Sequence, residues 1–550
     1  MPVTVVTLRA PAFASSRRPS TSPGRDRLAP RLAGALVGGA LTATAFPATA
    51  WWWAAPAGVA VLVLTVSGAR LHLRRAAFLG AVAGSAFALS TVNWLSTVAP
   101  EALVGVVAYF AVWWALLLAC LSIVLRRHGG LLLVPMVWVL VEWLRSGFPF
   151  GGFPWARLGF AALDGPWGWL IPYLGVYGLS FVLAAVGACL AGVLLRGRRQ
   201  GGPAVVAAGA ALAVLAAAGP WLDRVGASGR QHDAPTELLV AVVQGGPQQP
   251  GASPSQPRAV LEAHARVTGE LAARSTEQLD LVVWPENAAD IDPLQDEWAG
   301  QAVQDAVDEV GAPVVVGAVV ESPDGTGRVL NQAILWQPGS GPGSAYTKSR
   351  LVPFGEYVPF RSVLASIVPS LARVPRDMVP VEASPTLDVG PVRAGVLLCY
   401  EVAFDDKVQA AVREGAGLLL VPSNNATYSG SSQPLQQLAI ERFRALETAR
   451  AVLVASTTGV SALISPYGEV MDRLEDGDSG WLSGRVPVSE GATPAVSFGA
   501  AIGGVLAAGG AVAILLSALR PATGARPTRH RPASRRRHGP SRRTGWRARS

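Results

Sequence analysis

The sequence predicts a polytopic α-helical membrane protein of about eight transmembrane helices with an inserted, layered α/β domain. Half of the 550 residues are hydrophobic and only 15% are charged, a composition too apolar for an ordinary soluble protein. Long apolar runs fill residues 32–222 and recur at 495–519. Between them, short β-type runs alternate with helical stretches, which is typical of a layered α/β domain.

The membrane part is predicted from eight apolar runs, seven before the α/β region and one after it. A helix needs about 20 apolar residues to cross the hydrocarbon layer of a bilayer. Each run lacks internal charge except near its ends or at Glu142. The runs lie near residues 32–49, 51–69, 76–98, 102–125, 130–146, 168–195, 203–222 and 495–519.

The positions of the arginines predict the orientation. Cytoplasmic loops of membrane proteins are enriched in Lys and Arg. With eight spans, the Arg-rich segments all fall on one side, so both termini are predicted to be cytoplasmic and residues 223–494 extracytoplasmic. A cytoplasmic domain behind a miscounted helix is the alternative. The Arg-rich segments are the N-terminal segment, Arg70 to Arg75, Arg126 and Arg127, Arg196 to Arg199, and the C-terminal tail.

These patterns divide the chain into five segments. Residues 1–31 form a disordered extension rich in Arg, Ser and Pro, with no convincing signal-peptide cleavage site after it. Residues 32–222 form a seven-helix membrane domain, and residues 223–494 form the α/β domain. Residues 495–519 form the eighth helix, and residues 520–550 an Arg-rich cytoplasmic tail.

Charge, cysteines and histidines exclude several classes of function. The net charge is +9, but residues 520–550 contain eleven Arg and no acidic residue, so nucleic-acid binding is not predicted. Cys120 and Cys189 lie in apolar runs, which leaves Cys399 as a free thiol without a disulfide partner. The six histidines show no ligand spacing, and neither a metal nor another cofactor is expected.

Within 223–494, strands and helices are predicted to alternate, and site residues of such a domain lie at the carboxyl ends of strands. The predicted strands are Leu238 to Val243, Leu279 to Trp284, Pro313 to Val320, Gln332 to Trp336, Ala394 to Cys399, Leu418 to Pro422 and Val452 to Ser456. The predicted helices lie near 257–275, 299–310, 405–414 and 433–449.

Three chemically useful residues stand at predicted strand ends: Glu286, Lys348 and Cys399. A thiol with a pKa near 8.5 becomes a good nucleophile when a carboxylate takes its proton and an ammonium favours the thiolate and the developing oxyanion. Glu286 is therefore predicted as the base, Lys348 as the electrostatic partner and Cys399 as the nucleophile. A cysteine that merely fills the core at a strand end is the alternative.

Three motifs around these residues resemble the signatures of the nitrilase superfamily. They are Trp284-Pro285-Glu286-Asn287, the block from Lys348 to Phe360, and the segment from Cys399 to Phe404. The long middle block, on a domain between seven helices and an eighth, is similar to the apolipoprotein N-acyltransferase family of bacterial envelopes. The resemblance extends from about residue 32 to 519. It includes the membrane-part segments Glu142 to Arg145, Gly152 to Trp155 and Gly175 to Gly178.

The resemblance implies an αββα sandwich and a two-step reaction at the bacterial cytoplasmic membrane. Cys399 attacks an ester of a membrane phospholipid, and the acyl thioester then passes to the N-terminal α-amine of diacylglyceryl-cysteine in lipoproteins. Glu286 acts as base and later as acid. The implied partners are a phospholipid acyl donor and diacylglyceryl-modified lipoproteins, and the enzyme is expected to be a monomer.

The same resemblance implies three supporting residues. Glu356 helps to hold the carboxylate and lysine network, and Tyr400 and Glu401 shape the nucleophile loop. A solvated Glu356, and a Glu401 that pairs with Arg442 or Arg444, are the alternatives.

Two departures from the family pattern concern the substrate. A Trp expected after the first strand is absent from residues 246–256, and an Asn-Asp-Ala-Trp-type segment reads Asn424 to Tyr428 here. The second departure is expected to alter which acyl donor or acceptor fits.

Two other functions compete with acyl transfer. A membrane-tethered nitrilase or amidase would use the same three residues to hydrolyse a carbon-nitrogen bond, although one span would suffice as its anchor. An envelope scaffold with an inactive domain would not need the complete trio.

Overall fold

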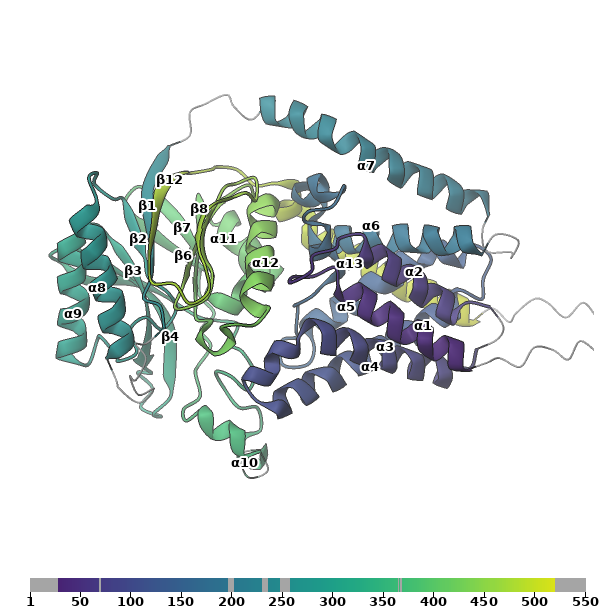
Figure 1. Ribbon diagram of the computed structural model, residues 1–550, viewed down its shortest axis with the longest axis horizontal. Coiled ribbons are helices and arrows are strands. Elements are labelled where there is room, and N and C mark those ends of the chain that lie inside the picture. Colours follow the sequence, from purple (N-terminus) through teal and green to yellow (C-terminus); the bar gives the residue numbers. More distant parts are fainter. Residues whose placement is uncertain are drawn as a thin grey trace, which may run out of the picture.

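The computed structural model describes residues 28–68, 71–195, 202–229, 236–247, 258–364, 366 and 368–519. The predicted tail at 520–550 and most of the predicted extension at 1–31 lie outside these ranges. Figure 1 shows two parts side by side, an α/β sandwich at the left and a bundle of apolar helices at the right.

Among the described residues, eight helices lie near the eight predicted apolar runs, and the last helix, α13, packs against α5 and α6. The eight are α1 (Leu28–Ala43), α2 (Ala54–Val66), α3 (Leu73–Thr91), α4 (Pro100–Val124), α5 (Val134–Gly147), α6 (Ile171–Leu194), α7 (Pro203–Gly229) and α13 (Pro494–Leu519).

Four segments are long and apolar enough to cross a membrane: Pro100–Val124, Gly130–Gly147, Gly168–Leu194 and Pro494–Leu519. The helices α1 and α2 are shorter than the predicted runs 32–49 and 51–69. The helix α1 begins at Leu28, inside the segment predicted to be disordered, and ends at Ala43 because the chain then turns through Pro47, which cannot continue a helix.

The helix α7 differs from the rest of the bundle. It runs along the upper edge of Figure 1, apart from most other helices. Its main contacts are with α6 and with the short helix Gly168–Leu170. Beyond α7 the chain enters the sandwich at β1 (Glu237–Gln244).

The sandwich consists of two six-stranded sheets between two pairs of helices, which confirms the layered α/β domain (Figure 1). The first sheet has the order β12-β1-β2-β3-β4-β5 and is covered by α8 (Ala259–Arg274) and α9 (Glu297–Val310). The second has the order β11-β10-β9-β8-β7-β6 and is covered by α11 (Asp405–Arg413) and α12 (Gln433–Thr448), which face the bundle.

Seven strands correspond to predicted ones, and their central members are parallel: β1 pairs with β2, β2 with β3, β7 with β8 and β8 with β9. These seven are β1, β2 (Leu281–Val283), β3 (Val314–Glu321), β4 (Val329–Gln337), β7 (Val392–Val396), β8 (Leu418–Ser423) and β9 (Ala451–Ser456).

Five strands lie outside the predicted strand ranges, although Lys348 was predicted to follow a strand. All five pair antiparallel at the sides of the sheets. They carry glycine or charge, as in β5, or are too short for a clear period. The five are β5 (Gly341–Thr347), β6 (Thr386–Val389), β10 (Ser461–Ile464), β11 (Val470–Leu474) and β12 (Gly480–Pro487).

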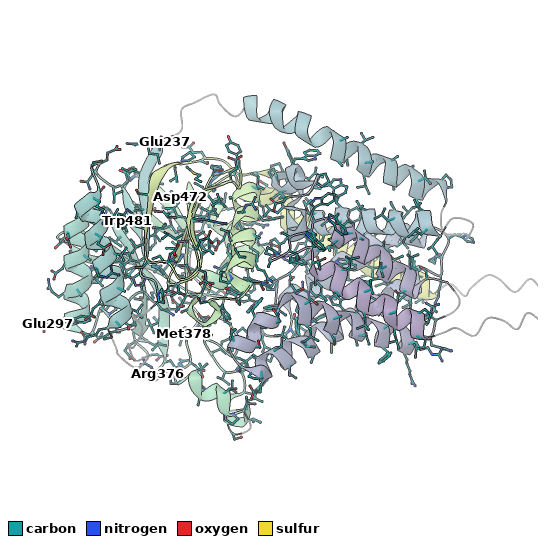
Figure 2. The ribbon with its side chains drawn as sticks, viewed as in Figure 1. Glu237, Glu297, Arg376, Met378, Asp472 and Trp481 are labelled. Atoms are coloured by element: carbon teal, nitrogen blue, oxygen red, sulfur yellow. The ribbon has the colours of Figure 1, made fainter. Side chains whose placement is uncertain are left out.

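The hydrophobic core joins the two parts of the molecule. Buried side chains of the bundle, such as Trp94 and Trp155, belong to one continuous cluster with side chains of α12, such as Ile440 and Phe443. A separate cluster fills the space between the two sheets. Polar side chains such as Glu297 of α9 lie on the outer surface, at the far left of Figure 2. The sandwich is therefore packed onto the bundle, not attached only through linkers.

Candidate active site

The three predicted catalytic residues follow strands of both sheets and lie at one edge of the sandwich. Glu286 comes after β2 and Lys348 directly after β5. Cys399 was predicted to end a strand, but β7 stops at Val396 and Cys399 begins the 3-10 helix Cys399–Ala403, here called the nucleophile helix.

Lys348 is the centre of a buried ionic cluster. Its Nζ donates to Oε1 of Glu286 at 2.8 Å and to Oε1 of Glu356 at 2.7 Å, and only 1% of its surface is exposed. Burial alone lowers the pKa of Lys348, but the two carboxylates outweigh burial and raise it well above its usual value. Lys348 is thus held as an ammonium ion.

Glu356 is a member of this cluster and not a solvated loop residue. Its side chain is 12% exposed, and its Oε2 accepts the backbone N–H of Val352 at 2.7 Å. Burial raises the pKa of Glu356, and the charge of Lys348 opposes that effect. The alternative of a solvated Glu356 is therefore wrong.

Glu286 accepts two further hydrogen bonds, one of them from Asn331, which the sequence did not single out. Asn331 of β4 donates from Nδ2 to Glu286 Oε1 at 2.8 Å and to Glu356 Oε1 at 3.2 Å. The backbone N–H of Asn424 donates to Glu286 Oε2 at 3.1 Å. These donors fix both carboxylate oxygens and leave Glu286 3% exposed.

Cys399 is buried and has a strained backbone. It is 8% exposed and has a φ of 51°, in the left-handed region that a non-glycine residue adopts only when its surroundings enforce it. Burial, and then the charge of Glu286, raises the pKa of the thiol, whereas the Lys348 ammonium and the Asn424 backbone N–H lower it. The thiol is therefore protonated at rest, and its proton must leave as the sulfur attacks.

Glu401 holds the nucleophile helix to the segment after Lys348. Its carboxylate accepts the backbone N–H groups of Ser349, Arg350 and Leu398 at 2.9 to 3.0 Å and the hydroxyl of Tyr346 at 2.8 Å. The alternative partners of Glu401 bind elsewhere: Arg442 pairs with Asp164, and Arg444 pairs with Asp405 and Glu447.

Tyr400 connects the nucleophile helix to the membrane part. Its ring stacks on those of Phe153 and Trp155, with 6.1 Å and 6.3 Å between the ring centres. Its hydroxyl donates to the Gly152 carbonyl at 3.3 Å. Burial raises the pKa of Tyr400 well above its usual value. The residue next to the thiol therefore lies against the loop that follows α5.

The segment from Asn424 to Tyr428 also borders the site. Asn425 donates from Nδ2 to Oε1 of Gln437, and that oxygen lies 3.9 Å from the Cys399 sulfur. The Tyr428 ring packs edge-on against Trp94 of the membrane part, with 5.1 Å between the ring centres. Gln437 is thus a further neighbour of the thiol that sequence reasoning missed, because a glutamine within an ordinary helix carries no distinguishing signal.

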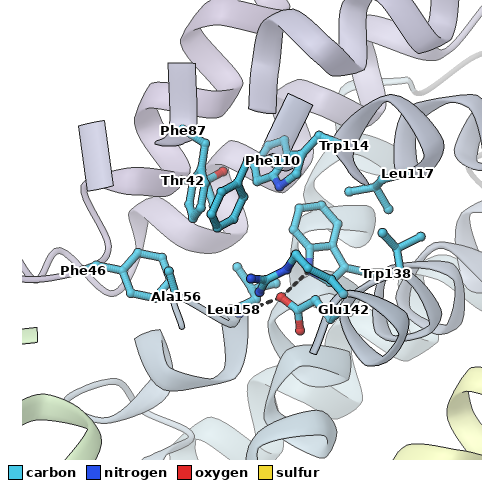
Figure 3. Close-up of a pocket in the computed structure, with 12 residues that line it drawn as sticks. Thr42, Phe46, Phe87, Phe110, Trp114, Leu117, Trp138, Glu142, Ala156 and Leu158 are labelled. Carbon is cyan, nitrogen blue, oxygen red and sulfur yellow. Dashed lines mark hydrogen bonds between the residues drawn. The ribbon is translucent and has the colours of Figure 1, made fainter. Parts of the chain in front are cut away.

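A separate cavity lies inside the bundle (Figure 3). It is bordered by Trp138 and Glu142 of α5 and by aromatic side chains of neighbouring helices, including Phe87 and Trp114. Glu142 accepts the Trp138 indole N–H at 3.1 Å and the Leu158 backbone N–H at 2.7 Å. None of the three catalytic candidates lines this cavity.

The described residues also contain no group of three His, Cys, Asp or Glu side chains placed to share a metal ion.

Comparison with known proteins identifies the family. Residues 38–189 match the apolipoprotein N-acyltransferase N-terminal domain, and residues 239–492 match the carbon-nitrogen hydrolase family. A Mycolicibacterium smegmatis protein named apolipoprotein N-acyltransferase is 34% identical over 90% of this chain and 86% of its own length. This chain belongs to the apolipoprotein N-acyltransferase family.

A second relative agrees with this membership. The apolipoprotein N-acyltransferase of Pseudomonas aeruginosa is 30% identical over 82% of this chain and 83% of its own length. The solved structure of an amidase from Nesterenkonia sp. is 20% identical and covers 47% of this chain and 93% of the amidase, with a TM-score of 0.36. The two family matches and the two relatives confirm the resemblance seen in the three motifs at the level of the apolipoprotein N-acyltransferase family, and with it the nitrilase-like domain.

Proposed function

We propose that this chain transfers a fatty acyl group from a membrane phospholipid to the N-terminal α-amine of diacylglyceryl-cysteine in lipoproteins, through a thioester on Cys399. One observation carries the proposal. The buried cluster of Glu286, Lys348 and Glu356 lies at a thiol whose neighbour Tyr400 packs against the membrane part. A site built against the membrane part suits a donor that arrives from the bilayer.

In the first step, Glu286 takes the proton of the Cys399 thiol while the sulfur attacks the ester carbonyl of the phospholipid. The negative charge that develops on the carbonyl oxygen is stabilised by the Lys348 ammonium. The carbon-oxygen bond of the ester then breaks, Glu286 returns the proton to the departing oxygen, and lysophospholipid leaves. The acyl group remains on sulfur as a thioester.

In the second step, the lipoprotein α-amine attacks the thioester carbonyl. Glu286 takes a proton from the amine, and the sulfur leaves and is protonated again. An amide forms and the free thiol returns. Burial of the site excludes water, which would otherwise hydrolyse the thioester.

The proposal extends to the arrangement in the membrane. The eight helices would each cross the bilayer, with residues 32–222 as the membrane domain, 223–494 outside the cytoplasm as the catalytic domain, and 495–519 as the eighth span. In support, α1 begins and α13 ends at the end of the bundle far from the sandwich (Figure 1). An even number of crossings returns the chain to the side on which it began. The proposal also has the enzyme act as a monomer in the bacterial cytoplasmic membrane.

The first test is to incubate the purified enzyme with phospholipid labelled in its acyl chain. A hydroxylamine-sensitive label on the wild-type enzyme, absent from Cys399→Ala and then transferred to a diacylglyceryl-cysteine peptide, is the expected result. If the intact enzyme acquires no label but releases ammonia from amides or nitriles, the hydrolase takes the place of the transferase.

A further inference from the structure

We propose that Arg157, a residue of the membrane part, is a positioning residue for Cys399. It fixes the C-terminal end of the nucleophile helix from the bundle side. The inference rests on the proposed function, because it concerns the same thiol. Arg157 lies in the loop between α5 and the 3-10 helix Leu158–Ala162, far from Cys399 in the sequence.

Arg157 contacts the last residue of the nucleophile helix directly. Its Nη2 donates to the Ala403 carbonyl at 2.8 Å, and its Nε donates to the Pro154 carbonyl of its own loop at 3.1 Å. The side chain is fully buried. An arginine can make these bonds together because its guanidinium presents donors in a fixed plane.

A second arginine, which belongs to the sandwich, binds the same turn. Arg444 of α12 donates from Nε to the Val402 carbonyl at 2.8 Å and from Nη2 to the Ala403 carbonyl at 3.0 Å. The Ala403 carbonyl thus accepts from one arginine of each part of the molecule. Both carbonyls belong to the last turn of a helix, where backbone acceptors lack partners within the helix.

Asp405 joins the two arginines to each other. Its Oδ2 accepts Nη1 of Arg157 at 2.6 Å, and its Oδ1 accepts Nη2 of Arg157 at 2.8 Å and Nη2 of Arg444 at 2.7 Å. Burial raises the pKa of Asp405, but the two arginines outweigh burial and lower it to about 2. Glu447, which pairs with Arg444, supplies the second carboxylate. Two cations and two carboxylates balance, so the cluster can remain charged while buried.

The nucleophile helix is therefore held at both ends. Glu401 binds its N-terminal side through the backbone N–H of Leu398, and the two arginines bind its C-terminal carbonyls. The left-handed backbone at Cys399 needs such enforcement from outside. Without Arg157, the turn would relax, and the sulfur would move away from the Lys348 ammonium and the Asn424 N–H that lower its pKa.

The test uses the full-length enzyme and the variants Arg157→Gln and Arg157→Lys. Arg442→Gln is the matched control, because Arg442 also joins α12 to the membrane part, through Asp164 at 2.9 Å, but touches no carbonyl of the nucleophile helix. The measurements are the rate of Cys399 acylation by labelled phospholipid, the midpoint of the pH profile for Cys399 alkylation by iodoacetamide, and the thermal midpoint of unfolding.

We expect Arg157→Gln to lower kcat for acylation by about tenfold or more, with KM for phospholipid within about twofold of wild type, since binding is not the step affected. The alkylation midpoint should move to higher pH. Arg157→Lys should recover part of kcat, because lysine keeps the charge but not the planar set of donors. Arg442→Gln should match wild type.

A folded Arg157→Gln enzyme with the wild-type acylation rate and alkylation midpoint would overturn the proposal. If that variant does not fold, a wild-type kcat in Arg157→Lys would overturn it instead. Alkylation requires no lipid. An enzyme that is never acylated would therefore contradict the proposed function alone, while the alkylation midpoints would still decide the role of Arg157.

Discussion

Asn331 shows how a neutral side chain can organise a charged site. Lys348 supplies one positive charge to two carboxylates, and Asn331 donates to the same two oxygens through one amide nitrogen. A neutral donor holds Glu286 and Glu356 together without adding a second cation that would reduce the basicity of Glu286.

We therefore expect Asn331→Leu to lower kcat/KM for acyl transfer by about 10- to 100-fold, because a lost hydrogen bond to a buried charged group costs about 1.5–3 kcal/mol. The measurement is the initial rate with labelled phospholipid and a diacylglyceryl-cysteine peptide. Gln332→Ala is the control, since the next residue of a strand faces the opposite side of the sheet. Equal losses in both variants would mean that the strand, and not the Asn331 amide, matters.

Glu441 offers a pH-dependent test of burial near the thiol. Burial raises the pKa of Glu441 to about 8, and its Oε1 accepts Nε2 of Gln437 at 3.0 Å. Between the usual carboxyl pKa, near 4.3, and about 8, the folded protein retains a proton that the unfolded chain has lost. The free energy of unfolding therefore decreases as pH rises through this window, by up to about 1.4 kcal/mol per pH unit from this group.

Glu441→Gln removes the titrating group and keeps an oxygen for Gln437. The thermal midpoint of Glu441→Gln minus that of wild type should therefore increase from pH 5 to pH 8. Differential scanning fluorimetry in detergent at several pH values measures it. A constant difference would show that Glu441 does not hold its proton in the folded state.

At this scale, sequence reasoning identified residues that belong to motifs and missed those that do not. Glu286, Lys348, Glu356 and Cys399 stand in segments that resemble known signatures. Asn331 lies in an ordinary strand, and its importance appears only when β4 and β5 pair and bring it beside Lys348.

The nucleophile helix is the element on which the site most depends. Its five residues are buried. Glu401 accepts the backbone N–H of Leu398, directly before this helix, and the backbone N–H of Ser349, in the segment after Lys348. A carboxylate suits this position because it only accepts hydrogen bonds, and every neighbour here donates.

Glu401→Gln should accordingly disturb the element although the side chain keeps its size. Its amide nitrogen would face donors, so we expect a lower thermal midpoint and an acylation rate reduced by about 100-fold. Glu382→Gln, at an exposed side chain, is the control. A Glu401→Gln enzyme with wild-type stability and rate would mean that the carboxylate charge is dispensable.

The elements found from the sequence differ physically from those that were missed. Buried parallel strands such as β8 and β9 are continuous apolar runs, and amphipathic helices such as α9 have a clear period. The missed strands owe their conformation to pairing. Three of the five residues of β11 are exposed, as in a polar loop, and β5 begins Gly341-Pro342-Gly343, which local preference assigns to a turn.

At the scale of the whole molecule, α12 ties the catalytic side to the membrane side. Gln436 accepts the indole N–H groups of Trp94 and Trp155 and donates to the carbonyls of Pro47 and Thr91. The next residue, Gln437, lies at the thiol. Composition and charge predicted that two parts exist. They did not predict that adjacent glutamines of one helix would contact the membrane part and the thiol, because these contacts depend on how the two parts pack together.

The orientation of the whole chain can be tested with single added cysteines. Glu297 is exposed on α9, at the end of the sandwich far from the bundle in Figure 2, and His128 is exposed in the loop between α4 and α5. If the sandwich lies outside the cytoplasm, an impermeant maleimide applied to intact cells should label Glu297→Cys and leave His128→Cys unlabelled. In permeabilised cells, both variants should be labelled.

The wild-type chain, with Cys120 and Cys399 buried, provides the baseline for labelling. Labelling of His128→Cys alone in intact cells would place the sandwich in the cytoplasm. That outcome would also separate the thiol from lipoproteins exposed on the outer face, since the acceptor amine must reach Cys399 from the side where the sandwich lies. The positive-inside rule makes the opposite outcome the expected one, because Arg126 and Arg127 stand directly before His128.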